Sequence, residues 1–417
     1  MGKKLNIYPV TIPQKIVLLE CLIDPGRKTY TEQVILRLRG QIKIGRIIQC
    51  WESLYESHSL LRARVVWRNL RSPIMVVSEG INRIKAINLG EFSVNKQIDI
   101  IKDISDENWR NTVNIEKESF IVNIIEQSNN EYILILDFHH IFIDGWSLST
   151  ILSEFMFTIS YGDDRKGLTD NYSKYISYYM SAKKNIQLQK YWSSYVTKME
   201  KKYSVRQNIR AEGNMRKLDI PVPTDIKKIC FDITHKNGIT FAALFYYLWA
   251  SVLNEVLSAD DICFGISVSG RDIPVDGVEK IVGMLVHTVL LKVDKESLNK
   301  DEPFLIMKSI MDDVQKSSQH SISFYPYLQS IGLSMNNEFH SIVTIQNYPN
   351  VWKSYCSNNT LELISRNFTN NIPLTFNIRW LPNDIYFDYT YTADIYDELF
   401  IKRVNRFIEM KIIDFLQ

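Results

Sequence analysis

Two adjacent histidines, His139 and His140, are the residues in this sequence best suited to acid–base chemistry. They open the segment His139–Ser147, which reads His-His-Ile-Phe-Ile-Asp-Gly-Trp-Ser. A neutral imidazole at the end of an apolar strand, beside a turn, can exchange a proton with a bound substrate. Gly145, just before a helical pattern, can offer its backbone N–H to a developing oxyanion. The segment therefore favours proton exchange with a bound substrate.

A metal site is the first alternative for adjacent histidines, and strand geometry argues against it. Successive side chains of a strand point to opposite faces, so His139 shares a face with Asp137 and His140 shares one with Phe138. One ion cannot easily engage both rings. The sequence has no H-E-x-x-H pattern, and its five cysteines are odd in number and far apart. We predict no metal site, no disulfide framework and reduced thiols.

The elements that must position the histidines are a strand before them and a helix after them. Residues 131–143 read as a strand, and apolar residues at helical spacing follow Ser147. We expect the helix to begin near Leu148 with Ser147 as its cap, and Asp144 to hold the turn through backbone bonds or a cation. Residues 31–39 alternate as a second strand, followed by a helical face over residues 44–55.

The second half of the sequence has the same mixed character. Its expected elements are a helical segment around Tyr191, a buried helix at 239–257, strands at 262–268, 282–293, 339–345 and 384–391, and a closing helix at 394–416. Because single cores rarely grow beyond ~250–300 residues, a chain of 417 residues predicts two lobes. The polar stretch 161–171 is the expected crossing between them.

Composition excludes several classes of partner. The chain has 49 basic and 47 acidic side chains, a net charge of +2, which does not indicate binding to nucleic acid or to an anionic membrane. No apolar run approaches the ~20 residues of a membrane-spanning helix, and the N-terminus lacks a signal-like apolar region. We expect a cytoplasmic protein.

The segment His139–Ser147 resembles the core motif of condensation domains from nonribosomal peptide synthetases. Other stretches resemble the motifs of that family and occur in the family's order. They are Tyr8–Gln14, Ser57–Arg62, Tyr191-Trp192, Ser269–Arg271, Ile281–Gly283 and Gln346–Pro349. The resemblance covers nearly the whole chain.

This resemblance implies an α/β fold of two chloramphenicol acetyltransferase-like lobes, each a mixed sheet with flanking helices, arranged as a V-shaped pseudo-dimer. The expected lobes are residues 1–165 and 166–417, with a tunnel between them. Donor and acceptor carrier proteins would dock at its mouths, and their phosphopantetheine arms would bring a thioester and an amine to His140. The implied reaction is amide formation by a monomer that binds no cofactor of its own.

The resemblance also assigns the site residues. The catalytic residues would be His140, His139 and Gly145, and the structural residues at the active site would be Asp144, Lys292 and Arg62. The substrate tunnel would contain Trp146, Ser147, His287 and Ser269. This chain has His287 and Lys292 where the family has asparagine and arginine. By resemblance Lys292 would face Asp144, although lysine lacks the planar fork of arginine.

Two alternatives stay open at this point. A related acyltransferase would use the same histidine-centred tunnel to form an ester or to accept an acyl-CoA donor. A catalytically silent module would only dock carrier proteins, but such modules tend to lose the motif histidines, and both are present here. No adenylate-forming or carrier-protein motif is found, so activated substrates must come from elsewhere.

Overall fold

The computed structural model describes residues 6–79, 83–111, 113–127, 130–162, 171–197, 214–259, 262–300, 302–331, 341–346, 359–381 and 384–416. The chain divides into two compact units that interleave along the sequence. Unit 1 comprises Met1–Met180, Pro274–Leu285 and Tyr348–Asn370, and unit 2 comprises Ser181–Ile273, Val286–Asn347 and Asn371–Gln417. The expected boundary at 165/166 lies outside the described residues and stays a prediction.

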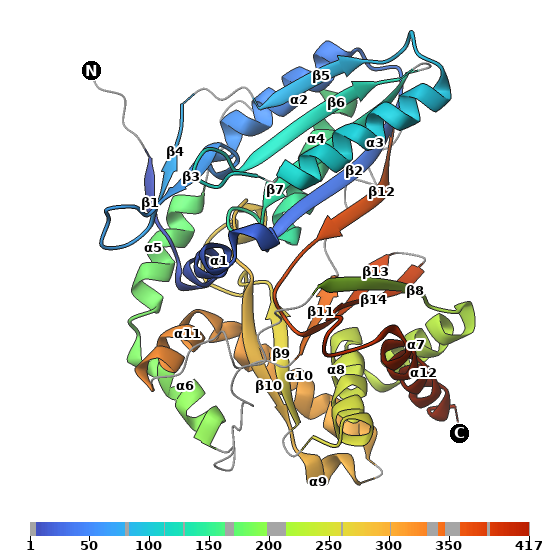
Figure 1. Cartoon of the computed structure of the whole chain (residues 1–417). Helices are drawn as coiled ribbons and strands as arrows, with labels where there is room; N and C mark the ends of the chain where they lie inside the picture. The colour runs from blue at the N-terminus through green and yellow to red at the C-terminus, as the bar shows by residue number, and fades with distance from the viewer. Residues whose placement is uncertain are drawn as a thin grey trace. The chain divides into compact units, whose positions relative to one another are not determined.

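Unit 1 is built on a five-stranded sheet in the order β12-β2-β7-β6-β5 (Figure 1). Its strands are β2 (Thr31–Arg39), β5 (Ile84–Asn88), β6 (Phe120–Glu126), β7 (Glu131–His139) and β12 (Thr360–Phe368). Only β5 and β6 pair in parallel. A smaller sheet orders β1 (Ile7–Pro9), β4 (Ile74–Val77) and β3 (Ala63–Val66). The helices are α1 (Ile12–Ile23), α2 (Ile44–Ser57), α3 (Val94–Asn111), α4 (Gly145–Tyr161) and α5 (Tyr172–Ala182), with short 3₁₀ turns at Pro25–Arg27, Ser59–Arg62 and Val278–Lys280.

Strand alternation divides the residues of this sheet between its two faces. Phe138 of β7 stacks on Phe120, and Trp51 of α2 lies between Phe120 and Phe155 of α4. On the opposite face, Ile133 and its neighbours pack against apolar residues of α3. Figure 1 shows α3 in front of the sheet and α2 and α4 behind it. The sheet is therefore covered by helices on both faces.

A buried polar cluster fastens α3 to the sheet. The Asp137 carboxylate accepts hydrogen bonds from Gln33 Nε2 at 2.8 Å and from Asn108 Nδ2 at 2.9 Å. Ser105 Oγ donates to Gln33 Oε1 at 2.9 Å. Asp137 is almost fully buried, and this burial raises the pKa of its carboxyl to about 6.

Unit 2 contains a six-stranded sheet in the order β10-β9-β11-β13-β14-β8. The strands are β8 (Met215–Pro221), β9 (Ile262–Val268), β10 (His287–Val293), β11 (Ile342–Gln346), β13 (Leu374–Leu381) and β14 (Asp384–Thr392). β11 runs parallel to both its neighbours, and the other pairs are antiparallel. The helices are α6 (Ile186–Thr197), α7 (Thr224–Asn237), α8 (Phe241–Ser251), α9 (Lys295–Leu298), α10 (Pro303–Gln319), α11 (Ser321–Ser330) and α12 (Glu398–Asp414), with a π-helical turn at Val252–Val256.

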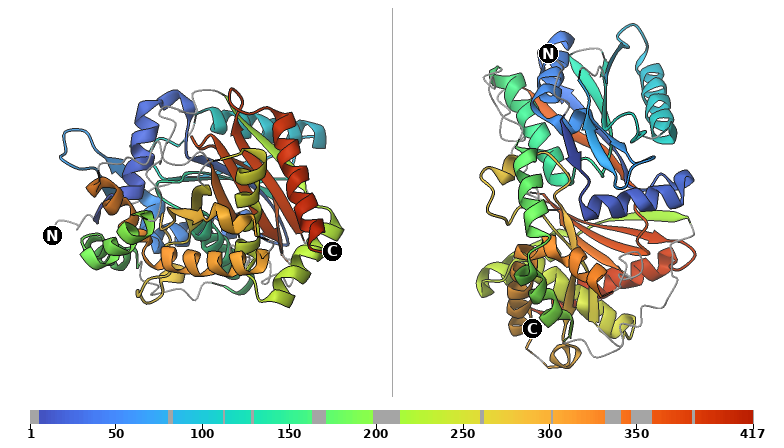
Figure 2. Two further views of the ribbon diagram at one scale, coloured as in Figure 1. Left: turned by 90° about the horizontal axis from the view of Figure 1, so that it is seen from below. Right: turned by 90° about the vertical axis from the view of Figure 1, so that its left-hand side faces the viewer.

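Aromatic rings form the core of unit 2. Phe376 of β13 stacks on Trp249 of α8 and on Tyr389 of β14, with ring centroids 5.3 Å and 4.8 Å apart. Helix α12 contacts both α7 and α8, and its course along the red strands is visible in Figure 2. Taken singly, none of the described helices is both long and apolar enough to cross a membrane; α7 and the helix Phe241–Val256 meet that test only as a pair bent by 113°.

The expected mixed α/β structure is confirmed in both halves, and several element ends differ from the predictions. The strands at 31–39 and 262–268 match β2 and β9. Strand β7 stops at His139, not at residue 143, and β10 begins at His287, not at 282. Both overestimates have one cause: buried apolar loop residues continue the strand pattern. The helical segment around Tyr191 is two helices, and the closing helix begins at Glu398 after its cap, Asp397.

Replacing Asp137 is expected to remove the pH-dependent contribution of this carboxyl group to the free energy of unfolding. Its folded pKa of about 6 exceeds the unfolded value of about 3.9, so the folded state binds the proton more tightly. The contribution of Asp137 to the unfolding free energy therefore falls as pH rises from about 4 to about 6. Urea denaturation of the wild type and Asp137→Asn at pH 4, 5, 6 and 7.5 measures it, with the exposed α3 variant Asp103→Asn as control. A wild-type-minus-variant difference that is constant across these pH values contradicts the prediction.

Candidate active site

The turn after β7 is held in place by backbone hydrogen bonds. The N–H of His140 donates to Tyr30 O at 2.8 Å, and the N–H of Phe142 donates to His139 O at 3.0 Å. Gln14 on α1 donates from Nε2 to Ile141 O at 3.0 Å. Gln14 is itself buried and forms a capping box with Thr11. Gln14, the last residue of the Tyr8–Gln14 stretch, therefore supports the histidine-bearing turn directly.

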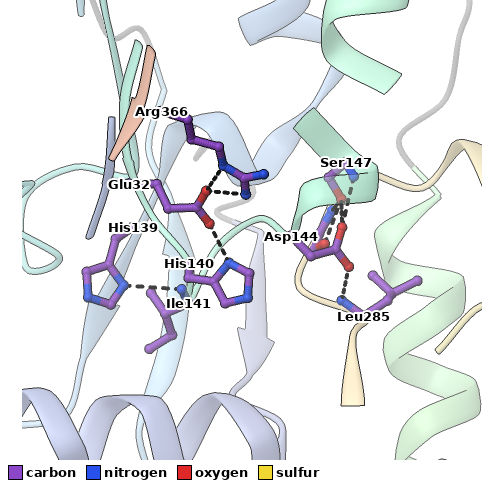
Figure 3. Close-up of polar contacts among 9 residues, drawn as sticks. Glu32, His139, His140, Ile141, Asp144, Ser147, Leu285 and Arg366 are labelled. Carbon is purple, nitrogen blue, oxygen red and sulfur yellow. Dashed lines mark hydrogen bonds and ion pairs between the residues drawn. The ribbon is translucent and has the colours of Figure 1, made fainter. Parts of the chain in front are cut away.

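Asp144 ends this turn and caps α4. Its Oδ1 accepts the N–H of Ser147 at 2.8 Å, and its Oδ2 accepts the N–H of Leu285 at 3.0 Å (Figure 3). The expected cap at Ser147 is thus wrong: α4 begins at Gly145, because the carboxylate three residues before Ser147 satisfies the helix N-terminus. Gly145 is the first helical residue, and it is not among the described glycines with positive φ.

Ser147 and Gly283 interlock beside Asp144. Ser147 Oγ accepts the N–H of Gly283 at 3.0 Å and lies 2.7 Å from Gly283 O and 2.8 Å from Asp144 Oδ1. Ser147 has no exposed surface, and its place in the substrate tunnel stays a prediction. Trp146 is half-buried, and its Nε1 donates to Glu279 O at 2.8 Å.

The His140 ring lies against a buried carboxylate. His140 Nδ1 is 2.8 Å from Glu32 Oε1, while Arg366 contacts Glu32 Oε2 from Nη2 at 2.7 Å and from Nε at 3.2 Å (Figure 3). Phe368 meets the imidazole edge-on, with ring centroids 5.7 Å apart. The side chain of Glu32 is 0% exposed and that of His140 is 18% exposed. Burial would raise the pKa of Glu32, but Arg366 and His140 outweigh it and lower that pKa to about 2.

His139 has a different environment from its neighbour. Its Nδ1 accepts the N–H of Ile141 at 3.2 Å, and its Nε2 lies 3.3 Å from Cys21 Sγ of α1. Only 3% of the residue is exposed, and burial lowers the pKa of this imidazole to about 3. His139 is therefore neutral at cellular pH and bonds to the turn that it precedes. Burial also raises the pKa of the Cys21 thiol to about 11.

The structure describes the surroundings of the other predicted site residues within their own units. Arg62 bonds to the carbonyls of Tyr55, Ser78 and Glu56, so it secures the end of α2 rather than the His140 turn. In unit 2, His287 is buried at the start of β10, Lys292 lies on the same strand, and Ser269 Oγ accepts the N–H of Arg271. The pairing of Lys292 with Asp144 stays a prediction.

Glu32 and Arg366 are the residues that the sequence analysis missed. Glu32 alternates with Val34, Leu36 and Leu38, so a carboxylate occupies the apolar face of β2. That anomaly was the available signal, because a buried carboxylate requires a partner. Its partner Arg366 is 334 positions away, and only the β12–β2 pairing brings the two together. Within the described ranges, no three His, Cys, Asp or Glu side chains are grouped so that they could hold a metal ion.

The profile of the condensation domain family matches residues 4–417 of this chain. The chain belongs to the condensation domain family. Tyrocidine synthase 3 from Brevibacillus parabrevis is 24% identical to this chain over 96% of this chain's length. Bacitracin synthase 1 from Bacillus licheniformis is 22% identical over 97% of this chain. Malformin synthetase mlfA from Aspergillus vadensis is 24% identical over 90% of this chain. The chain spans only 6%, 8% and 7% of these three proteins, respectively.

Solved condensation domains share the fold. The first condensation domain of the calcium-dependent antibiotic synthetase, in complex with a substrate analogue, superposes with a TM-score of 0.75 at 14% identity, covering 97% of this chain and 96% of that one. The starter condensation domain of rhizomide synthetase, a mutant in complex with C8-CoA, gives 0.75 at 12% identity, with coverages of 98% and 95%. The condensation-domain fold predicted from the motifs is thereby confirmed.

Gly283→Ala is expected to destabilise this condensation domain. A Cβ at position 283 would lie 2.6 Å from a ring carbon of Tyr172, which is closer than real Cβ atoms approach. Overpacking of this kind typically costs ~1–3 kcal/mol, and the bonds from Gly283 to Ser147 would also be strained. Thermal and urea unfolding measure the loss. Gly45→Ala in α2, where nothing lies within 4 Å, is the matched control and should not lower stability. Equal stability of the two variants contradicts the assignment.

Proposed function

We propose that this condensation domain joins a carrier-bound acyl or aminoacyl thioester to an amine and forms an amide in nonribosomal peptide synthesis. The observation that carries the proposal is the setting of His140. Its Nδ1 is engaged by Glu32, its side chain keeps 18% of its surface exposed, and its Nε2 has no hydrogen bond within the described residues. That nitrogen is the one available to a bound substrate.

The reaction is a substitution at the thioester carbonyl. The amine nitrogen forms a bond to the carbonyl carbon, and the C–S bond breaks to release a thiolate. The amine proton passes to His140 Nε2 and from there to the departing sulfur, so His140 ends as it began. An α-amino group has an ordinary pKa near ~7.7–8.0, and a useful fraction is neutral at cellular pH. His140 therefore positions the amine as well as accepting its proton.

The remaining motif residues hold the geometry of this step. His139 is buried and neutral, and we assign it to shaping the turn rather than to proton transfer. Asp144 fixes the start of α4, where the N–H of Gly145 is proposed to face the developing oxyanion. Trp146, His287 and Ser269 stay proposed substrate contacts.

The substrates reach the domain on carrier proteins. Donor and acceptor are proposed to arrive as phosphopantetheine thioesters on separate carriers, in trans or from a larger synthetase, and the arm is part of the substrate. The relatives that contain similar segments are synthetases far longer than this chain, which supports that arrangement.

His140→Ala is expected to lower amide formation from a loaded donor carrier by roughly 10²-fold or more, the lower end of what positioned proton transfer contributes. The loss should be greater with a hydroxyl acceptor, because a neutral hydroxyl is a weaker nucleophile than a neutral amine and depends more on a base that takes its proton. Intact-mass measurement of acyl transfer between defined carriers gives the rates. His235→Ala, on an exposed side chain of α7, is the control.

The outcomes separate the rival functions. Near wild-type amide formation by His140→Ala removes the catalytic assignment. Faster transfer to the hydroxyl acceptor than to the amine in the wild type identifies an ester-forming acyltransferase. Carrier binding without turnover in any pairing identifies a docking module.

A further inference from the structure

The Glu32 carboxylate is shared between an imidazole and a guanidinium. One oxygen lies 2.8 Å from His140 Nδ1, and the other lies 2.7 Å from Arg366 Nη2. Glu32 lies on β2, His140 directly follows β7, and Arg366 lies on β12; in the strand register Glu32 faces Phe138 on one side and Phe368 on the other. The Glu32 side chain has no contact with solvent, so these two partners replace the water that it lost.

This arrangement fixes which nitrogen of His140 carries the proton. Glu32 is ionised, because its pKa is about 2, and an ionised carboxylate can only accept hydrogen bonds. Nδ1 must therefore be the donor. The neutral ring then has its lone pair on Nε2, the nitrogen that the proposed reaction uses.

We propose that Glu32 and Arg366 are positioning residues for His140. Glu32 sets the tautomer of the ring and stabilises its protonated form. Arg366 offsets part of the negative charge of Glu32. The inference rests on the proposed function, since it assumes that His140 exchanges the proton. Arg366 opposes protonation of His140 electrostatically while holding Glu32 in its bonding geometry. The two charges therefore act on the ring in opposite directions.

Few other ionisable groups act on the ring. His139 on β7 interacts electrically with both His140 and Glu32, but it is buried and neutral. Cys21 on α1 contacts His139 and Thr29, and its thiol is protonated at cellular pH. Phe368 on β12 supplies an uncharged edge contact. In the described part of the chain, the charges that contact the His140 ring or its carboxylate partner are thus those of Glu32 and Arg366.

Opposite effects of two substitutions follow from this charge arrangement. Glu32→Gln keeps the shape and an oxygen acceptor for Nδ1 but removes the negative charge, so the acidic limb of the pH–rate profile moves to lower pH. Arg366→Gln removes the positive charge and leaves the carboxylate facing the ring, so that limb moves to higher pH. A charge at hydrogen-bond distance, as Glu32 is from the ring, corresponds to a shift of about one pH unit or more, and the more distant Arg366 should give a smaller one. A merely structural role would lower activity in both variants without moving the limb in opposite directions.

The test is the pH–rate profile of amide formation for the wild type, Glu32→Gln, Arg366→Gln and Arg366→Lys, with the folded fraction of each verified by circular dichroism. Arg366→Lys keeps the charge and should keep the limb near its wild-type position. Arg37→Gln removes an arginine from the same strand as Glu32, where Arg37 pairs with Glu131 and Glu362, and should leave the limb in place. Parallel displacement, or no displacement, of the limb in Glu32→Gln and Arg366→Gln overturns the inference.

A second measurement does not depend on activity or on the stability of a positioning variant. ¹⁵N chemical shifts of histidine-labelled wild-type protein, with His140 assigned by comparison with His140→Ala, should show a protonated Nδ1 and an unprotonated Nε2 above the acidic limb. The reverse tautomer overturns the inference. If His140→Ala retains full activity while the tautomer is as expected, the proposed function fails and the geometry of the pair stands. If His140→Ala is inactive but the profiles do not diverge, only the positioning roles fail.

Discussion

The burial of the Glu32 carboxylate is the constraint that determines how the residues around it in the candidate site are arranged. A buried ionised group is tolerated only when it is paired and hydrogen-bonded. The Glu32 carboxylate on β2 therefore needs hydrogen-bonding partners, and they come from the segments on either side of β2. Arg366 on β12 and the ring of His140 after β7 meet that need. The contacts that satisfy the buried carboxylate therefore also fix the orientation of His140, the motif histidine that retains exposed surface.

The two histidines show how one strand end can serve two purposes. His139 ends the strand, loses its charge through burial, and bonds to the turn that follows. His140 follows the strand and keeps both a carboxylate partner and access to solvent. Around them, Gln14, Tyr30 and Gly283 bond to backbone groups of the segment, and Gly283 also bonds to the Ser147 hydroxyl. Most of the motif is thus used to make a rigid support for a single ring.

Local patterns were enough to predict much of this fold. The alternation over residues 31–39 and the compact run at 262–268 define their strands well, because each is bounded by polar turn residues. The strand ends near residues 143 and 282 were missed, since buried loops such as Ile141–Ile143 are as apolar as strands. The family and its histidine motif were readable from order and spacing. The Glu32–Arg366 pair was not, because a contact across 334 positions has no local pattern to reveal it.

Residues 348–370 belong to unit 1 although they are synthesised late, so the site can be completed only near the end of translation of this segment. Chains grow at ~5–20 residues per second, so on the ribosome β2 and its carboxylate exist for many seconds before Arg366 is made. During that time β12 does not yet exist, so the edge of β2 that it will cover stays unpaired. Translation must pass residue 368 before this part of the molecule can close, so premature termination upstream would release a first unit whose sheet is one strand short.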